Sequence, residues 1–161
     1  AAKTGLVPFM DPAVYGRSPL ENSSFLVSSA HPDETLHGAG FVARLSGSTA
    51  EFIQIWSVLM AGPQPFEVEK GDLVLALRPM LAEWLFDADD QVAFTFLGRC
   101  RITYHNPARK DTHAPGMQIQ RTVLHPKQGA PITVAGPTLS APHAHQVRNG
   151  EIVAMDVYFS R

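Results

Sequence analysis

The sequence predicts a mainly β fold, in which an antiparallel β-sandwich follows a helical segment. Three observations predict this class. A single long apolar helix pattern ends at Gly62-Pro63, and beyond Pro65 the apolar residues recur with a period of two instead of about 3.6. Turn-forming residues are also frequent, with 12 glycines and 13 prolines among 161 residues. The change of period divides the chain into a first segment, 1–62, and a β-sandwich domain, 63–161.

The first segment is turn-rich over residues 1–44 and then predicts one helix, roughly 48–61. Ser48 and Glu51 have the spacing of a capping box, and Gly62 ends the helix. The helix is apolar almost all round, whereas a surface helix has a single apolar stripe. Two interpretations are open: a core helix packed on the β-sandwich, and a helix that belongs to a larger helical assembly.

The second segment predicts short strands separated by turn signals, as in a sandwich. Gly98 marks a turn between two of them, and Asn149-Gly150 is the dipeptide that a type I′ hairpin turn prefers. The expected strands cover residues 73–77, 92–96, 100–104, 117–124, 131–135, 146–148 and 151–159.

Charge and apolar content limit the partners of the chain. The 13 basic and 15 acidic residues give a net charge of −2, which argues against a nucleic-acid or membrane partner. No apolar run approaches the roughly 20 residues that a membrane helix needs. Charged residues make up only 17% of the chain, which suggests a face that lies against something else and leaves a homo-oligomer open. Cys100 is the only cysteine, which excludes an intramolecular disulfide and favours a cytoplasmic setting.

Several residues could carry chemistry, and each has a simpler interpretation. On a strand, the pair His143 and His145 would face one side, as a cupin-type metal site requires, but the proline-rich surroundings favour solvated histidines. Cys100 lies in a strand pattern, which favours a buried thiol over a nucleophile. A glycosidase acid/base pair could be assembled from loop carboxylates, although such residues are mostly solvated; these are Asp11, Glu21, Asp33 and Glu34.

The segment 44–49 places hydroxyl residues and a glycine at the start of the expected helix. Free backbone amides and the positive end of the helix dipole form an anion site at such a position. Every capped helix offers the same donors, so the pattern alone leaves open both an anion site and a simple cap.

Four short motifs follow one another, at residues 15–25, 41–52, 78–84 and 96–107. They contain Glu21-Asn22, Leu45-Ser46-Gly47-Ser48, Arg78-Pro79-Met80-Leu81-Ala82-Glu83-Trp84 and Tyr104-His105-Asn106-Pro107. In this order they resemble the C-terminal part of the inverting disaccharide phosphorylases of glycoside hydrolase family 94, which include the cellobiose, chitobiose and 1,2-β-oligoglucan phosphorylases. The first motif is closest to the 1,2-β-oligoglucan branch.

The resemblance implies an (α/α)₆ barrel followed by a C-terminal β-sandwich, with residues 1–62 as the end segment of the barrel. It also implies a glycosyltransferase that reversibly phosphorolyses a β-glucoside or oligoglucan to α-glucose 1-phosphate with inversion. Inorganic phosphate is the co-substrate, and no cofactor or metal is expected. The Thr-Gly pair that binds phosphate in the family falls on Ser46 and Gly47.

The resemblance further implies that the chain supplies only part of an active site. The family's general-acid aspartate lies upstream, so no catalytic residue is expected here and the remainder of the barrel becomes a required partner. Substrate contacts are expected from Glu21, which matches the acidic residue of the family's first motif, and from Asn22. A glutamine of the family's glucose subsite falls on Val27, and Ser28 or Ser29 is expected to replace it. The alternative function is a stand-alone carbohydrate-binding or structural β-sandwich without catalysis.

Overall fold

The computed structural model describes residues 27–39 and 46–160. The chain divides into two compact units, Ala1–Trp56 and Ser57–Arg161. Helix α3 (Ser46–Ala61) crosses this division, so its last turn belongs to the second unit. Among the helices of the described ranges, none is long and apolar enough to cross a membrane.

Residues 27–39 form a small closed loop in the first unit, and main-chain hydrogen bonds join its two ends. Asp33 caps the 3-10 helix η2 (Glu34–Leu36). Its Oδ1 accepts hydrogen bonds from the hydroxyl of Thr35 at 2.6 Å and from the Thr35 amide at 3.0 Å. These two bonds hold the pKa of Asp33 below its ordinary value. The Asp33 carboxylate therefore has a local structural role as a helix cap.

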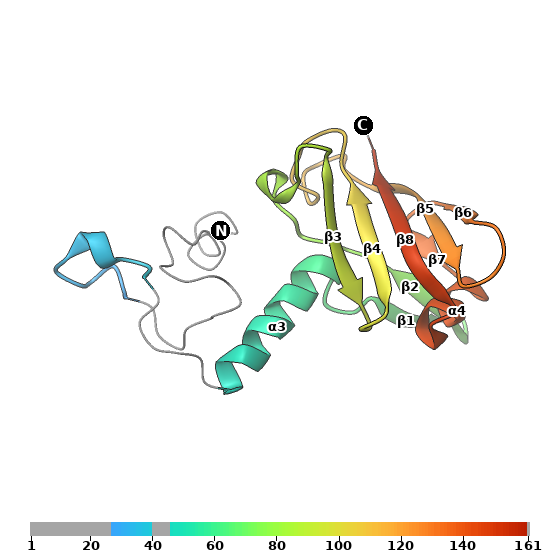
Figure 1. Cartoon of the computed structure of the whole chain (residues 1–161), viewed down its shortest axis with the longest axis horizontal. Coiled ribbons are helices and arrows are strands. Elements are labelled where there is room, and N and C mark those ends of the chain that lie inside the picture. The colour runs from blue at the N-terminus through green and yellow to red at the C-terminus, as the bar shows by residue number, and fades with distance from the viewer. Residues whose placement is uncertain (1–26, 40–45, 161) are drawn as a thin grey trace. The chain divides into compact units, whose positions relative to one another are not determined.

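The second unit contains two sheets, which Figure 1 shows with the small sheet behind the large one. The three-stranded sheet has the order β1 (Phe66–Glu69), β2 (Asp72–Ala76) and β7 (Thr138–Leu139). The five-stranded sheet has the order β3 (Gln91–Phe96), β4 (Cys100–His105), β8 (Ile152–Phe159), β5 (Ile119–Pro126) and β6 (Ile132–Ala135). The short helices η3 (Glu83–Leu85) and α4 (His143–Asn149) complete the described elements of this unit.

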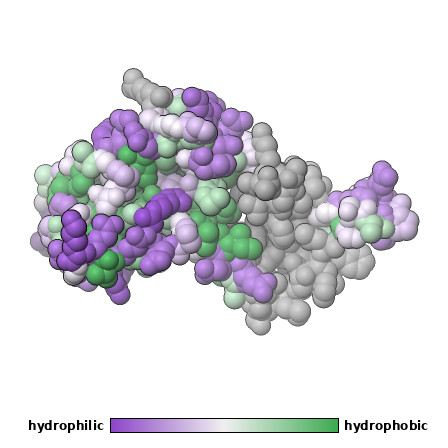
Figure 2. Space-filling model, turned by 180° about the vertical axis from the view of Figure 1, so that it is seen from behind, coloured by the Kyte–Doolittle hydropathy of each residue, from purple (hydrophilic) through white to green (hydrophobic). Residues whose placement is uncertain are grey.

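The two sheets and α4 are held over a common core. Phe66 of β1 stacks on Phe96 of β3, with ring centroids 5.9 Å apart, and α4 packs against both β2 and β8. The fully buried side chains come from every layer and include Leu75, Ile102, Tyr104, Leu124, Val147, Met155 and Val157. From behind, the surface of this unit carries hydrophilic residues interspersed with hydrophobic ones (Figure 2). The mainly β class that the sequence predicts is confirmed.

The predicted purely antiparallel arrangement is wrong for one strand pair. Strand β8 lies between β5 and β4, antiparallel to β5 but parallel to β4. A parallel pair needs a long crossover, and the chain between β4 and β8 supplies one through β5, β6, β7 and α4. Alternation of apolar residues gives the face of a strand but not its direction, so the sequence could not show this.

The predicted strand over 146–148 and the hairpin turn at Asn149-Gly150 are also wrong, because these residues belong to α4 and its C-cap. Gly150 has a left-handed backbone, φ 78°, and its N–H bonds the last carbonyls of the helix. A type I′ turn and a helix C-cap both require positive φ, so the same dipeptide serves either. The buried residues of α4, Ala144 and Val147, have helical spacing.

Helix α3 begins at Ser46, two residues before its predicted start. Ser48 therefore lies inside the first turn of the helix and not at the N-cap position that the sequence predicted. At the other end Gly62 terminates the helix as predicted, with φ +93° and its N–H donating to Val58 O at 2.9 Å. A Cβ at Gly62 would lie 3.1 Å from the Cβ of Arg78, so the close approach of the two segments requires glycine.

Three groups from later in the chain donate hydrogen bonds to the carbonyl oxygens in the last turn of α3. The bonds are Met80 N–H to Leu59 O at 2.8 Å, Tyr104 Oη–H to Met60 O at 2.7 Å and Arg78 N–H to Ala61 O at 3.1 Å. Burial raises the pKa of Tyr104, which keeps its hydroxyl protonated as a donor. Carbonyls at a helix C-terminus have no partner within the helix, so these bonds fix its end to the sheets. We call this set of bonds the α3 anchor.

Candidate functional site

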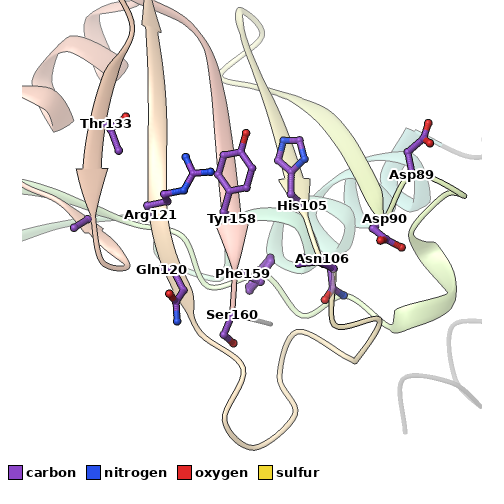
Figure 3. A pocket seen from close by; sticks show the side chains of 12 residues that line it. Asp89, Asp90, His105, Asn106, Gln120, Arg121, Thr133, Tyr158, Phe159 and Ser160 are labelled. Atoms are coloured by element: carbon purple, nitrogen blue, oxygen red, sulfur yellow. The ribbon is translucent and has the colours of Figure 1, made fainter.

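The outer face of the five-stranded sheet, opposite the core, carries a row of planar side chains. In the sheet register, His105 of β4 pairs with Tyr158 of β8, which pairs with Arg121 of β5. The His105 ring stacks on Tyr158 with centroids 4.3 Å apart and an interplanar angle of 7°. The Arg121 guanidinium carbon lies 3.7 Å from the centre of the same Tyr158 ring. Tyr158 thus stands between the other two side chains (Figure 3), and we call this arrangement the stacked row.

A hydrogen-bonded bridge lies beside the stacked row on the same face. His105 Nε2–H donates to Asp156 Oδ1 at 2.9 Å, and His125 Nε2–H donates to Asp156 Oδ2 at 2.7 Å. Burial alone would raise the pKa of Asp156, but the bonds from His105 and His125 hold it below its ordinary value. In the ranges 27–39 and 46–160, no group of three His, Cys, Asp or Glu side chains is arranged to hold a metal ion. The hydrogen bond to Asp156 orients the His105 ring of the stacked row.

A hollow of about 870 Å³ lies over the stacked row. Asp89 and Asp90 form one wall, while Gln120 and Thr133 belong to the opposite side. Figure 3 shows the two aspartates across from Arg121, with Tyr158 and His105 between them. The cavity falls within the usual size of ligand pockets, roughly 300–1,000 Å³. We call it the outer hollow.

A β-bulge shapes the Gln120 side of the outer hollow. Ile119 pairs with Phe159 and Arg121 pairs with Tyr158, so Gln120 is an extra residue in β5. Residues alternate between faces along a regular strand, but here Gln120 and Arg121 are both exposed in succession. Bulges often redirect side chains next to functional sites. This bulge places an amide and a guanidinium together at the outer hollow.

The opposite wall is held by the turn before β3. Asp87 Oδ1 accepts hydrogen bonds from the amides of Asp89 and Gln91, each at 2.9 Å. Arg109 pairs with the Asp90 carboxylate and also donates to the carbonyl of Ala88 at 2.9 Å. These bonds fix the backbone of the turn at Asp89 and the carboxylate of Asp90.

The residues that the sequence predicted for phosphate and sugar binding lie in the first unit. Ser46 and Gly47 are the first two residues of α3, where backbone amides lack partners within the helix. Ser28 and Ser29 lie in an exposed turn of the loop 27–39, and Ser28 Oγ accepts a hydrogen bond from the Ala30 amide at 3.2 Å. The remaining two predicted contacts, Glu21 and Asn22, fall outside the described residues.

The structure bears on two further predictions from the sequence, the possible metal site at His143 and His145 and the role of Cys100. The two histidines lie on α4, where residues two apart face different directions, so the strand geometry of an H-x-H metal site is absent from this helix. His143 Nδ1 instead contacts Gln146 Oε1 at 3.0 Å. Cys100 is completely buried, and burial raises the pKa of its thiol to about 11. The prediction of a buried structural thiol is confirmed.

Comparison with known proteins assigns no family to this chain. No protein-family model matches it, and no curated protein matches it. We therefore infer its function from its own residues.

Proposed function

We propose that this chain is the C-terminal part of an inverting carbohydrate phosphorylase. The proposed enzyme cleaves a β-glucoside or β-glucan with inorganic phosphate and releases α-glucose 1-phosphate. In this proposal α3 is a helix of an (α/α)₆ barrel, and the two sheets form the β-sandwich that follows the barrel. The four ordered motifs in the sequence are the first support for this assignment.

The observation that carries the proposal is the α3 anchor together with the apolar character of the helix. The last turn of α3 is fixed to the sheets, whereas Ile53 and Ile55 are 59% and 47% exposed. An apolar helix with such exposed positions is typical of a helix that packs against further helices. A barrel wall joined to a sandwich would have this construction.

The motif residues support the same assignment by their positions. Arg78 and Met80, from the third motif, donate two bonds of the α3 anchor. Tyr104, from the fourth motif, donates the third bond. The last two of the four motifs therefore contribute to a single junction between the helix and the sheets.

The proposed reaction is a direct displacement at the anomeric carbon. A phosphate oxygen forms the new bond to this carbon, while the bond to the glycosidic oxygen breaks and the configuration inverts. A carboxylic acid from the upstream barrel donates a proton to the leaving oxygen, and no catalytic base is needed because phosphate is already anionic. Amides at the start of α3, at Ser46 and Gly47, hold the phosphate through hydrogen bonds and the helix dipole.

The experiment is a phosphate-dependence measurement on the longer protein encoded by the complete reading frame. Gly47→Val keeps the backbone N–H but adds a branched side chain that keeps the anion away from the amides. Loss of one hydrogen bond to a charged ligand in this way raises the apparent KM for phosphate about 10- to 150-fold. The KM for the sugar should change much less. Gln128→Ala, an exposed position in the second unit, is the control and should leave both values unchanged.

Three results would overturn parts of this proposal. A reading frame without a barrel upstream would remove the phosphorylase assignment and favour the stand-alone sandwich. Production of glucose 1-phosphate from sophorose by the 161-residue chain alone would show that the general acid is not upstream. An unchanged KM for phosphate in a folded Gly47→Val enzyme would show that the start of α3 does not bind phosphate.

A further inference from the structure

We propose that the outer hollow is a binding site for a neutral saccharide, bound between Arg121 on one side and Asp89 on the other. The proposal concerns the second unit and does not require phosphorolysis. It rests on the proposed function only for the choice of the first sugar linkage to test.

The polar groups in the outer hollow match the hydroxyl groups of a sugar. A sugar hydroxyl can both donate and accept a hydrogen bond. Arg121 and the Gln120 amide supply donors, while the carboxylate of Asp89 supplies acceptors on the facing wall. The hydroxyl of Tyr158 and that of Thr133 can act in either sense. A ligand with many hydroxyl groups can accept hydrogen bonds from the Arg121 side and donate hydrogen bonds to the Asp89 side at the same time.

The charges in the hollow favour a neutral ligand over an anion. Arg121 is the one Lys or Arg among its lining residues, and two carboxylates, Asp89 and Asp90, face it. Arg109 compensates Asp90 through its ion pair, so the charges of Asp89 and Arg121 balance. A phosphorylated ligand or a nucleic acid that approached Arg121 would also meet the Asp89 carboxylate. The negative charge of such a ligand and that of Asp89 repel each other.

The outer hollow is held in shape before any ligand binds. The Arg121 side chain already lies against the Tyr158 ring, so it loses little rotamer freedom on binding. The Asp156 bridge fixes the His105 ring, and the hydrogen bond from the Asp89 amide to Asp87 fixes the backbone of the turn that carries Asp89. Such preorganisation raises affinity by lowering the entropy cost of binding.

The same contacts argue for binding without catalysis at this site. Both oxygens of Asp156 are engaged by histidine N–H groups, and both histidines use their Nε2 atoms in that bridge. Asp90 is committed to Arg109. An acid/base pair needs two groups that are available to the substrate, and these contacts leave Asp89 as the unengaged carboxylate of the lining.

The test is an NMR titration of the ¹⁵N-labelled 161-residue chain with sophorotetraose, cellotetraose, maltotetraose and, separately, glucose 1-phosphate. Concentrations of up to about 10 mM detect dissociation constants near 1 mM. At least one neutral tetrasaccharide should shift the amide resonances of Gln120, Arg121 and Asp89. Arg121→Ala should weaken this binding about 10-fold, and Gln120→Ala should weaken it about 2- to 10-fold.

Arg101→Ala is the matched control, because Arg101 is exposed on the same face but does not line the hollow. The affinity of the Arg101→Ala chain for the tetrasaccharide should stay within about 2-fold of the affinity of the chain without the substitution. The proposal is overturned if no tetrasaccharide shifts these resonances, if glucose 1-phosphate binds more tightly than the neutral sugars, or if Arg101→Ala weakens binding as much as Arg121→Ala. Because this assay contains no barrel and no phosphorolysis, its failure leaves the phosphate test of the longer protein intact.

Discussion

Removing one oxygen atom from the α3 anchor should destabilise the second unit measurably. Tyr104→Phe deletes the hydroxyl that donates to Met60 O at 2.7 Å and keeps the ring, which lies 5.9 Å from Phe94 and 5.8 Å from Phe159. Tyr104 and Met60 are 0% and 2% exposed, so water cannot replace the lost donor without rearrangement. A buried carbonyl left without this partner costs about 1–3 kcal/mol of unfolding free energy.

The assay for Tyr104→Phe is equilibrium urea unfolding followed by tryptophan fluorescence. With an m-value of about 2 kcal/mol per molar urea for a domain of this size, the midpoint should fall by about 0.5–1.5 M. Tyr158→Phe is the matched control, since its hydroxyl lies in the outer hollow, and its midpoint should change little. Equal midpoints for Tyr104→Phe and the unchanged chain would refute the role assigned to the α3 anchor.

Two further predictions concern stability. Gly62→Ala should lower the free energy of unfolding by about 1–3 kcal/mol, because φ is +93° and the new Cβ would lie 3.1 Å from that of Arg78. Gly129→Ala is the control, since φ is +97° but nothing lies within 4 Å of the new Cβ, and it should cost less in the same urea assay. Equal losses of stability in the two variants would contradict the steric argument. Asp156 has a lowered pKa in the folded state, so its contribution to stability is present above its unfolded pKa of about 3.9 and is lost as pH falls through the folded value. Asp156→Asn should therefore flatten the decrease of the urea midpoint below about pH 4, and an unchanged decrease would assign acid sensitivity to other carboxylates.

The sequence predicted the strands whose apolar side chains face one core. Strands β3 and β4 were found because Phe94 and Phe96, and then Ile102 and Tyr104, alternate with polar residues. Helix α4 was missed because it has only seven residues and its C-cap uses the same Asn-Gly dipeptide as a hairpin turn. The alternation of apolar and polar residues therefore located these strands, whereas the Asn-Gly dipeptide gave a wrong prediction because it suits both a hairpin turn and a helix C-cap.

The outer hollow could not be predicted in the same way. Arg121, Tyr158 and His105 come from three strands and meet only through the order and register of the sheet. The parallel placement of β8 beside β4 and the extra residue Gln120 in β5 both determine this register, and neither has a signature in the alternation pattern. The polar residues of the outer face were visible in the sequence, but their proximity was not.

The central position of β8 has a consequence for the order in which the sheet can assemble. Strands β3 and β4 form one local hairpin, and β5 and β6 form another, but β8 joins the two hairpins. During synthesis both hairpins leave the ribosome before β8 and each then has an unpaired inner edge. The large sheet can therefore close only after translation has passed Phe159, because β8 is the strand that joins the two hairpins.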